Sequence, residues 1–519
     1  MLAFIAHVLP GPRTIDDAFI TFRYARNILA GSGFVYNPGE HVLGTTTPLY
    51  TLLLTGIGLV MGGEQAPFPQ ISLLINALAA VGTCFLLIKL GQRLGSPRAG
   101  LAAALVWGIA PYSVTFSVGG LETSLYVFFL IATVYYFVTH AHLSASVFAA
   151  CAVLTRPDAL ILIGPLALER FSEETQLFLS SRRNSTSNRS SADKAHWRSL
   201  LLEAALFLIP LLLWLAFATY YFGSPLPHSI EAKSLAYRLP ATAALTRLLQ
   251  HYATPFFEHN IFGIPWIAVG LVLYPFLYLI GASKIFKEEK RTLAFLVYPW
   301  LYLITFAIAN PLIFRWYLTP PLPLYFLIIF IGASKIIETL ILSRRKFINE
   351  NTFNPPLLKF SIFVVMLLPF TTTLTEWRIV PDHGLDRPAP EMAWYQLELL
   401  YTQAADYLRP QFGENSVLAA GDVGVLGYRT NAPILDTVGL NSRQAIAYYP
   451  LDPEYYVINY AVPPDLIFDE KPDFIVVLEA YVRNGLLKEE EFLASYRLIK
   501  KIPTDIYGSD GMLLFRRIP

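Results

Sequence analysis

Long apolar stretches recur along most of the chain and predict membrane-spanning helices. A helix needs roughly 20 mostly apolar residues to cross about 30 Å of hydrocarbon, where its backbone polar groups find no water. Stretches of about this length lie at residues 71–90, 99–118, 123–140, 199–221, 261–281, 293–309, 319–341 and 359–376. A ninth stretch, 143–169, is interrupted by Arg156, Pro157 and Asp158, which predicts a helical hairpin with these residues at its turn. The pattern predicts about 10 to 11 spans.

Two shorter apolar stretches are not expected to cross the membrane in full. Residues 1–9 are too short for a span and lack the charged start of a secretory signal peptide. We expect either a truncated first span, which we favour, or an end that lies in the interface. Residues 48–62 are expected to form a short re-entrant or interfacial helix, because only then do the loops alternate consistently across the membrane.

Composition supports a polytopic membrane protein. Of 519 residues, 54% are hydrophobic and 15% are charged, against about 25% charged in an average soluble domain. Thirty-nine Lys and Arg against 38 Asp and Glu leave a net charge of +1, so no basic field indicates a nucleic-acid partner. Cys84 and Cys151 both lie in apolar stretches and have neither a disulfide pattern nor a zinc-site spacing.

The distribution of Lys and Arg predicts the orientation. These residues concentrate in the loops 89–98, 170–198, 282–292 and 342–359, which we therefore place in the cytoplasm. The loop 170–198 is expected to be a cytoplasmic linker, and its Ser-rich segment 181–192 is expected to be flexible. The alternate loops, beginning with a first outer loop at 11–70, then lie outside the cytoplasm.

From about residue 377 the hydrophobic runs shorten to strand length. They lie at 416–420, 474–478, 497–502 and 512–515, and are separated by helical stretches such as 392–408 and 488–494. This alternation predicts a small α/β domain over 377–519, following a transmembrane domain over 1–376. The orientation places the α/β domain on the extracytoplasmic face.

The first outer loop contains an amphipathic helix with an acidic start. Residues 16–29 place an apolar stripe on one face, formed by Ala18, Phe22, Ala25 and Leu29. Arg23 and Arg26 fall on another face, where arginines would equally suit an interfacial anchor along the membrane surface. Asp16 is well placed to cap this helix, which leaves Asp17 for another function.

Further ionisable residues collect on the same outer side. They are Glu122, Arg156, Asp158, His228, Glu231, Lys233 and Arg315. Each alone has an ordinary explanation, such as an ion pair across a turn for Arg156 and Asp158. Because ionisable groups at membrane depth are costly, their gathering on one face predicts a shared polar cavity. Two groups of glycines, at 56–63 and 421–427, fail the spacing of a nucleotide-binding loop, so no nucleotide site is predicted.

Several of these motifs resemble bacterial GT-C membrane glycosyltransferases. The motifs are residues 16–27 from Asp16 to Asn27, Gly31-x-Gly33-x-x-x-Asn37-x-Gly39-Glu40, Gly120-Leu121-Glu122-Thr123, Thr155-Arg156-Pro157-Asp158 and Gly421-Asp422. The likeness is greatest to the arabinofuranosyltransferases that place terminal β-(1→2) residues on mycobacterial cell-wall arabinan. It covers residues 14 to 320 and again 416 to 440.

The resemblance implies a reaction and its place in the cell. Such enzymes lie in the bacterial inner membrane and transfer a sugar from a polyprenyl phosphate to an extracytoplasmic glycan, lipid or protein acceptor. The donor sugar stays open between a pentose such as arabinofuranose and a hexose, because Pro227-His228-Ser229 stands where relatives more often have Pro-Asn-Thr. An outward-facing site has no supply of nucleotide sugars, so a lipid-linked donor agrees with the predicted topology.

The resemblance also implies roles for the candidate residues. An acidic residue of the first outer loop, Asp16 or Asp17, would be the general base. The candidates to stabilise the departing phosphate are Arg156, Lys233, Arg315, Arg23 and Arg26. The candidates for contacting substrate are Glu122, Asp158, His228, Glu231, Tyr24, Trp316 and Asp422. A divalent metal could sit on the acidic pair, but no His-rich ligand set requires one.

Two other functions remain open at this point. A transporter or flippase of a lipid-linked sugar would also use buried charges, but the chain has no evident internal repeat and its acidic pair lies in a loop. A non-catalytic envelope assembly protein would explain the C-terminal domain but not the acidic loop.

Overall fold

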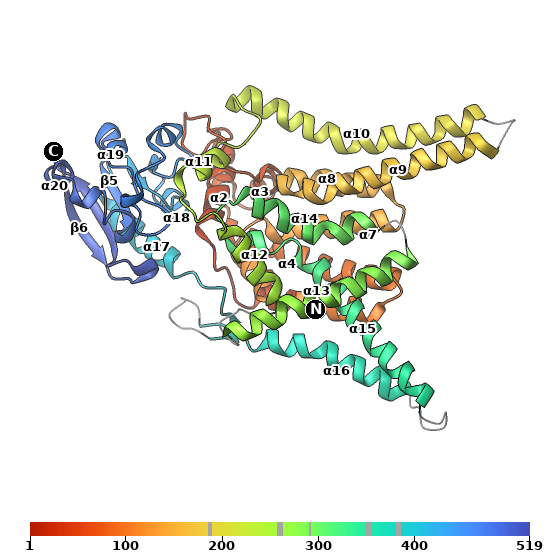
Figure 1. Cartoon of the computed structure of the whole chain (residues 1–519). Coiled ribbons are helices and arrows are strands. Elements are labelled where there is room, and N and C mark those ends of the chain that lie inside the picture. The colour runs from red at the N-terminus through yellow and green to blue at the C-terminus, as the bar shows by residue number, and fades with distance from the viewer. Residues whose placement is uncertain (185–188, 257–262, 290–291, 348–354, 380–385) are drawn as a thin grey trace.

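The protein consists of a bundle of long helices joined to a smaller C-terminal part that contains a sheet (Figure 1). The computed structural model describes residues 1–184, 189–256, 263–289, 292–347, 355–379 and 386–519. Between bundle and sheet lie the short helices α2 (Asp16–Leu29), α11 (His228–Ala236) and α18 (Gly424–Thr430). This junction is where the polar residues of the chain meet.

Helices occupy every stretch that the apolar pattern predicted. They are α4 (Phe68–Arg93), α5 (Pro97–Trp107), α6 (Pro111–Val118), α7 (Thr123–Val138), α8 (His142–Thr155), α9 (Leu160–Asn184), α10 (Arg189–Phe222), α13 (Gly263–Glu288), α14 (Leu293–Ala309), α15 (Leu322–Phe347) and α16 (Pro355–Leu374). The predicted break at Arg156–Asp158 is confirmed, because α8 ends at Thr155 and a short 3₁₀ turn, Pro157–Ala159, precedes α9. The stretch 99–118 is bent by 47° between α5 and α6, where Pro111 interrupts the helix.

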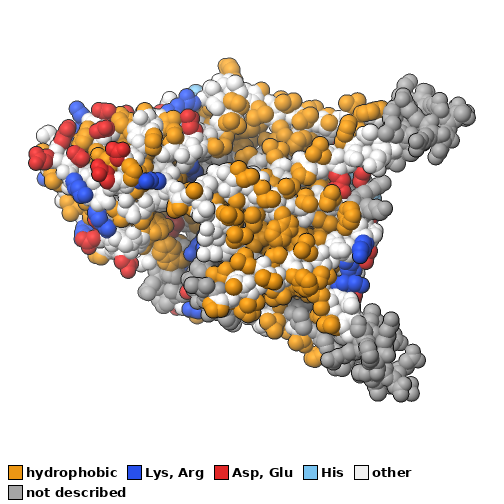
Figure 2. Space-filling view, in the orientation of Figure 1, with side chains coloured by type: hydrophobic (Ala, Val, Ile, Leu, Met, Phe, Trp, Pro, Cys, Tyr) orange, Lys and Arg blue, Asp and Glu red, His pale blue; other side chains and the backbone are white. Residues whose placement is uncertain are grey.

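Four described segments are long and apolar enough to cross a membrane by length and composition. They are Phe68–Arg93, Trp197–Phe222, Pro265–Glu288 and Arg315–Leu340, and the bent pair α5 and α6 makes a fifth if it counts as one span. The helices α7, α8 and α14, and also α3 (Pro48–Val60), are apolar but shorter. Apolar side chains form a broad belt over the bundle, between a charged C-terminal part and a group of Lys and Arg at the other end (Figure 2). The predicted number of crossings therefore stays a prediction.

The prediction of a flexible linker at 181–192 is wrong for the residues of that segment that the structure describes. The helix α9 continues to Asn184 and α10 begins at Arg189, while residues 185–188 lie outside the described part. Arg170 donates two hydrogen bonds to Glu203 of α10, at 3.0 and 2.9 Å, and pairs one turn along its own helix with Glu174. These ion pairs extend both helices beyond the apolar stretches, because charged partners at this spacing stabilise a helix that apolarity alone would not predict.

The C-terminal part has the predicted α/β composition. Its helices and strands are α17 (Gln396–Leu408), β3 (Leu418–Ala420), β4 (Ile434–Asp436), α19 (Pro464–Glu470), β5 (Phe474–Leu478), α20 (Glu490–Ser495), β6 (Tyr496–Ile502) and β7 (Met512–Arg517), with α18 between β3 and β4. The sheet order is β4-β3-β5-β7-β6, with β3 parallel to both β4 and β5. Strand β7 is antiparallel to β5 and β6. A separate antiparallel pair is formed by two short strands, β1 (Trp377–Arg378) and β2 (Ala389–Pro390).

The helix α2 is buried between the two parts and does not lie along a membrane surface as predicted. Its apolar stripe packs in the core of the bundle, and Tyr24 on another face belongs to the same hydrophobic core as the strands of the C-terminal sheet. Arg23 is only 1% exposed. The first outer loop is therefore a structural part of the C-terminal domain, although some 380 residues separate them in the chain.

At this junction the N-termini of α2 and α18 are each capped by a carboxylate from a distant segment of the chain. The Asp16 carboxylate accepts hydrogen bonds from the backbone N–H groups of Gly424 and Val425, at 2.8 and 2.7 Å, at the start of α18. In return Glu398 of α17 accepts one from the backbone N–H of Asp16, at 3.2 Å, at the start of α2. Asp16 therefore caps α18 and not its own helix, whose N-cap position is Ile15. A side chain at Gly424 would collide with the backbone oxygen of Asp16, so this contact requires glycine.

Asp16→Ala is expected to lower the free energy of unfolding by about 2–4 kcal/mol, because it leaves two buried N–H groups without an acceptor. The measurement is thermal or denaturant unfolding of the purified protein in detergent. Asp17→Ala, at the next position, is the matched control and should change stability little, since Asp17 is partly exposed. Equal losses in the two variants would contradict the assignment.

Candidate active site

A cavity of about 480 Å³ opens at the junction of bundle and C-terminal part. It is bordered by α2, by the loop at Gly44–Thr47, by the turn before α7 and by α11. The charged residues that line it are Asp17, Glu122, Arg156, Asp158 and Lys233. The predicted shared polar cavity thus brings together charged residues from four separate segments of the chain.

Asp17 and Lys233 form one charged pair of the cavity. The Lys233 Nζ lies 4.0 Å from Asp17 Oδ2, and the two side chains are 27% and 35% exposed. The same ammonium lies 5.0 Å from the centre of the Phe314 ring, a cation–π arrangement. Both oxygens of Asp16 are occupied by backbone donors, whereas Asp17 keeps a carboxylate that faces the open cavity. The acidic pair is thus divided into a buried structural residue and an accessible one.

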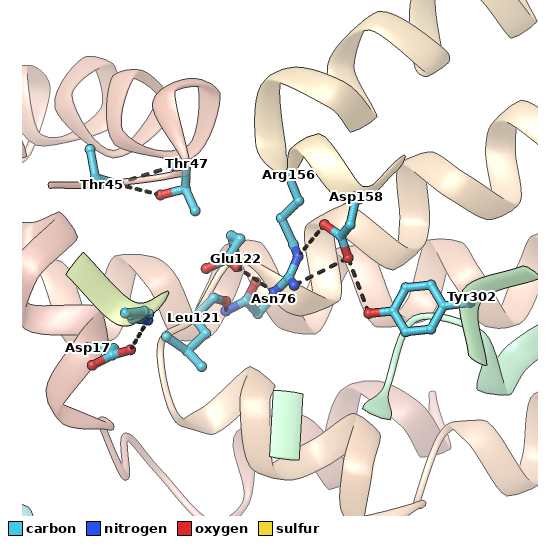
Figure 3. Close-up of polar contacts among 10 residues, drawn as sticks. Asp17, Thr45, Thr47, Asn76, Leu121, Glu122, Arg156, Asp158 and Tyr302 are labelled. Carbon is cyan, nitrogen blue, oxygen red and sulfur yellow. Dashed lines mark hydrogen bonds and ion pairs between the residues drawn. The ribbon is translucent and has the colours of Figure 1, made fainter. Parts of the chain in front are cut away.

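Arg156 is the centre of a buried ionic network (Figure 3). Its Nε and Nη2 donate to the two oxygens of Asp158, at 2.9 and 3.3 Å, and its Nη1 donates to Glu122 Oε1 at 3.2 Å. Tyr302 donates to Asp158 Oδ2 at 3.2 Å, and the guanidinium lies 4.7 Å from the centre of the Tyr317 ring. Two carboxylates around one guanidinium leave this group with a net charge of −1.

Buried hydrogen bonds fix two loops that border the cavity, the turn at Leu121–Glu122 and the loop Gly44–Thr47. Asn76 of α4 donates to the Leu121 carbonyl at 2.8 Å and fixes the turn that presents Glu122 (Figure 3). Tyr24 donates to the Val42 carbonyl at 2.7 Å and accepts from the Gly44 N–H at 2.9 Å. Tyr24 is therefore a positioning residue for the Gly44–Thr47 loop and does not line the cavity.

A second acidic group lies behind Asp17, at the end of strand β3. Asp422 accepts a hydrogen bond from the Tyr401 hydroxyl at 2.6 Å, and burial, together with the Asp17 charge, raises its pKa to about 6. Burial, together with the Asp422 and Asp17 charges, raises the pKa of Glu398 to about 7. Neither residue lines the cavity, so Asp422 contributes to the electrostatics of the site from behind.

Several predicted site residues lie elsewhere. Arg23 donates to the carbonyls of Tyr36 and Ala432, at 2.8 and 2.9 Å, so it joins α2 to the C-terminal part. Arg26 donates to the Tyr428 carbonyl at 2.7 Å. Neither arginine borders the cavity.

The remaining candidates divide in the same way. Trp316 lines the cavity and stacks on Phe314, with ring centres 4.6 Å apart. Arg315 is exposed and lies near Tyr507 of the C-terminal part. The backbone N–H of His228 donates to Leu43, at 2.9 Å, and its ring lies 3.9 Å from Glu231, which is 63% exposed. Arg315, His228 and Glu231 are not among the lining residues.

Sequence reasoning missed other residues of the site. Thr45, Thr46 and Thr47 line the cavity, and a run of three hydroxyls after Gly44 is the signal that could have indicated them. Tyr237, at the end of α11, also lines it. Glu398 gave no local signal, because its importance comes from a contact with Asp16 far along the chain.

No group of three or more His, Cys, Asp or Glu side chains that could hold a metal ion occurs among the described residues. The charged groups of the cavity are instead paired with one another. The arrangement supplies an accessible carboxylate, an accessible ammonium and hydrogen-bond acceptors within a partly enclosed space, which suits proton transfer beside a developing negative charge.

Comparisons with known proteins find a glycosyltransferase relative for part of the chain. The chain is 34% identical over 171 residues to the terminal beta-(1->2)-arabinofuranosyltransferase of Mycobacterium tuberculosis, a match that covers 30% of this chain. It spans 27% of the length of that relative. Residues 390–515 match the model of a domain of unknown function, DUF8728.

Solved structures show a similar fold over most of the chain. ArnT from Cupriavidus metallidurans superposes with a TM-score of 0.54 at 12% identity, covering 99% of this chain and 95% of that one. The oligosaccharyltransferase AglB from Archaeoglobus fulgidus, in complex with an inhibitory peptide and a dolichol-phosphate, gives a TM-score of 0.51 at 12% identity, covering 91% and 66%. Both are GT-C glycosyltransferases. The chain has a GT-C fold. The expected resemblance is confirmed at the level of the fold. The cavity of this chain lies where the bundle and the C-terminal part meet.

Removing the central cation of the buried network should be strongly destabilising. Arg156→Met leaves the Glu122 and Asp158 carboxylates buried without a counter-charge, and we expect a loss of about 3–5 kcal/mol in unfolding free energy. Glu231→Gln is the control, because that side chain is exposed. A loss below about 1 kcal/mol, typical of surface ion pairs, would contradict the network.

The stability of the junction should depend on the protonation of Glu398. Its pKa of about 7 in the folded protein lies above the ordinary value of 4.5, so the folded state holds a proton that the unfolded state has released. The contribution of this group to stability therefore falls as pH rises and is lost once pH passes about 7. The test compares melting temperature against pH for the wild type and for Glu398→Gln, whose side chain cannot ionise. Between about pH 4.5 and 7 the melting temperature of the wild type should fall relative to that of the variant, and above pH 7 the two curves should be parallel. Parallel curves throughout would exclude the effect.

Proposed function

We propose that the chain is a membrane glycosyltransferase of the GT-C type that uses a polyprenyl-phosphate sugar as donor. The observation that carries this proposal is the pair of Asp17 and Lys233 at one cavity, on the open side of a GT-C fold. The arabinofuranosyltransferase relative supports a pentose donor such as arabinofuranose, with a hexose as the alternative. The dolichol-phosphate bound to AglB supports a lipid carrier.

Asp17 is the proposed general base. The acceptor hydroxyl oxygen forms a bond to the anomeric carbon of the donor while the bond from that carbon to the phosphate oxygen breaks. The hydroxyl proton passes to the Asp17 carboxylate, and the electron pair leaves with the polyprenyl phosphate. Asp16 cannot serve in this way without giving up the N–H groups of Gly424 and Val425, which supports Asp17 as the base.

Lys233 is the proposed partner of the departing phosphate. Its ammonium lies 4.0 Å from one carboxylate, that of Asp17, and is partly exposed, whereas Arg156 is buried between two carboxylates. A phosphate entering the cavity competes with Asp17 for this ammonium, which frees the carboxylate to approach the acceptor. Charge stabilisation at a leaving oxygen is strong where water is excluded.

Arg156 has a different proposed role from the phosphate contact considered for it above. Its guanidinium is balanced by two carboxylates, so it adds no positive field to the cavity. We assign it to orienting Glu122 and Asp158, whose oxygens accept hydrogen bonds from sugar hydroxyls. Trp316 and Tyr317, which line the same wall, offer ring faces to the sugar.

The proposed location follows from charge and fold together. A group of Lys and Arg lies at the end of the bundle away from the C-terminal part (Figure 2), and by the positive-inside rule this supports a cytoplasmic location for that end. The cavity and the C-terminal domain then face the outside of a bacterial inner membrane, and the domain presents a glycan, lipid or protein acceptor.

The test supplies purified protein with a radiolabelled polyprenyl-phosphate pentose or hexose and a glycan acceptor. The wild type should lengthen the acceptor, and Asp17→Asn should lower the rate about 10²- to 10⁴-fold while the protein stays folded. Lys233→Met should lower it about a hundredfold. Glu231→Gln, on the same helix as Lys233 but outside the cavity, is the control and should keep its activity.

The same experiment separates the enzyme from a flippase. Movement of the lipid-linked sugar across a reconstituted bilayer without a lengthened product would overturn the proposal. An active Asp17→Asn variant would overturn the assignment of the base.

A further inference from the structure

A second cavity, of about 420 Å³, lies outside the proposed active site. It sits where α2, the connection between α3 and α4, and the end of α18 meet, and shares no lining residue with the first cavity. Its polar lining residues include Arg23, Arg26, Asn27, Glu64, Gln65 and Asn431. Two arginines one helical turn apart thus face a polar space that the proposed reaction does not use.

Neither arginine has a carboxylate partner within 4 Å among the described residues. Arg23 is 1% exposed, its bonds go to two carbonyls and to the Asn37 amide oxygen, and its Nη1 has no hydrogen-bond partner. Burying a cation without a counter-charge is costly, and a second cation nearby adds repulsion. This cavity therefore carries an unbalanced positive charge.

Arg26 is the arginine that is placed to contact a ligand. Its Nη1 donates to the Tyr428 carbonyl at 2.7 Å, and its guanidinium lies 4.6 Å from the centre of the Tyr428 ring. These contacts fix the plane of the guanidinium and leave N–H groups on its other edge for an anion. A fixed guanidinium matches two oxygens of a phosphate group. Glu64 is the acidic residue among those lining the cavity; it is exposed, lies beyond ion-pair distance of Arg26, and offsets only part of the positive charge.

Apolar side chains beside the cavity indicate what carries the phosphate. Leu59, Val60 and Met61, at the end of α3, are 69%, 81% and 51% exposed, and only Gly62 and Gly63 separate them in the chain from the lining residues Glu64 and Gln65. Such a group of exposed apolar residues next to a cationic pocket suits an acyl chain below a phosphate headgroup.

We infer that the second cavity binds the phosphate of an anionic lipid headgroup through Arg26, with Arg23 supplying positive charge from behind. The inference does not rest on the proposed transferase activity, because the two cavities are separate. Two arginines and one glutamate line this cavity, and a bound phosphate balances the positive charge that Glu64 leaves over.

The test measures binding to the full chain in detergent with two probes, phosphatidylglycerol and inorganic phosphate, and with phosphatidylcholine as the uncharged reference. Phosphatidylglycerol should bind more tightly than phosphatidylcholine. Arg26→Gln should raise its Kd about tenfold or more, since one charged hydrogen-bonding group is lost. Glu64→Gln should lower the Kd about two- to fivefold, because it removes a repulsive charge from an exposed position. Glu231→Gln, which is exposed and lines neither cavity, should leave the Kd unchanged.

The outcomes separate the sources of the anion. Binding of phosphatidylglycerol but not inorganic phosphate supports a lipid headgroup, whereas equal dependence of both probes on Arg26 supports a site for free phosphate. The proposal is overturned if neither probe binds, or if both Arg26→Gln and Glu64→Gln bind like the wild type. Because Glu64→Gln predicts a gain, the result stays decisive even if Arg26→Gln folds poorly.

Discussion

The exchange of capping groups between α2 and the C-terminal domain determines where the reactive groups lie. A helix start leaves N–H groups that need acceptors, and here Asp16 serves α18 while Glu398 serves α2. Gly424 lets the two backbones approach closely enough for this contact. Successive residues on a helix point about 100° apart, so fixing Asp16 against α18 directs Asp17 into the cavity. One structural carboxylate thereby orients its neighbour for chemistry.

The charges around the cavity are divided between a closed group and an open one. Arg156, Glu122 and Asp158 satisfy one another in a buried network, which makes them rigid and slightly negative as a unit. Lys233 and Asp17 form a longer, partly exposed pair that an entering anion can separate. Rigid acceptors for hydroxyls on one side and a movable ion pair on the other provide different surroundings for a sugar and for a phosphate.

The sequence was sufficient for features that depend on near neighbours. Apolar length located the long helices, Pro157 marked the break before α9, and the short apolar run 474–478 was strand β5. Features that depend on distant partners were beyond it. Asp16 looked like the cap of its own helix because its partner Gly424 lies 408 residues away. The glycines at 421–427 could be excluded as a nucleotide loop, but their role as a place of close approach to α2 required the fold.

The helix α2 is the segment at which the two cavities and the C-terminal domain meet. Its 14 residues serve three surroundings: Asp17 faces the active-site cavity, Asp16 and Arg23 hold the C-terminal domain, and Arg26 faces the second cavity. A surface helix tolerates exchange at most polar positions, whereas a helix packed on every side does not. A substitution at almost any polar position of α2 therefore changes a charge, a cap or a domain contact. The same helix links the two cavities mechanically, because a shift that moves Arg26 toward an anion must also move Asp17 or bend the helix between them.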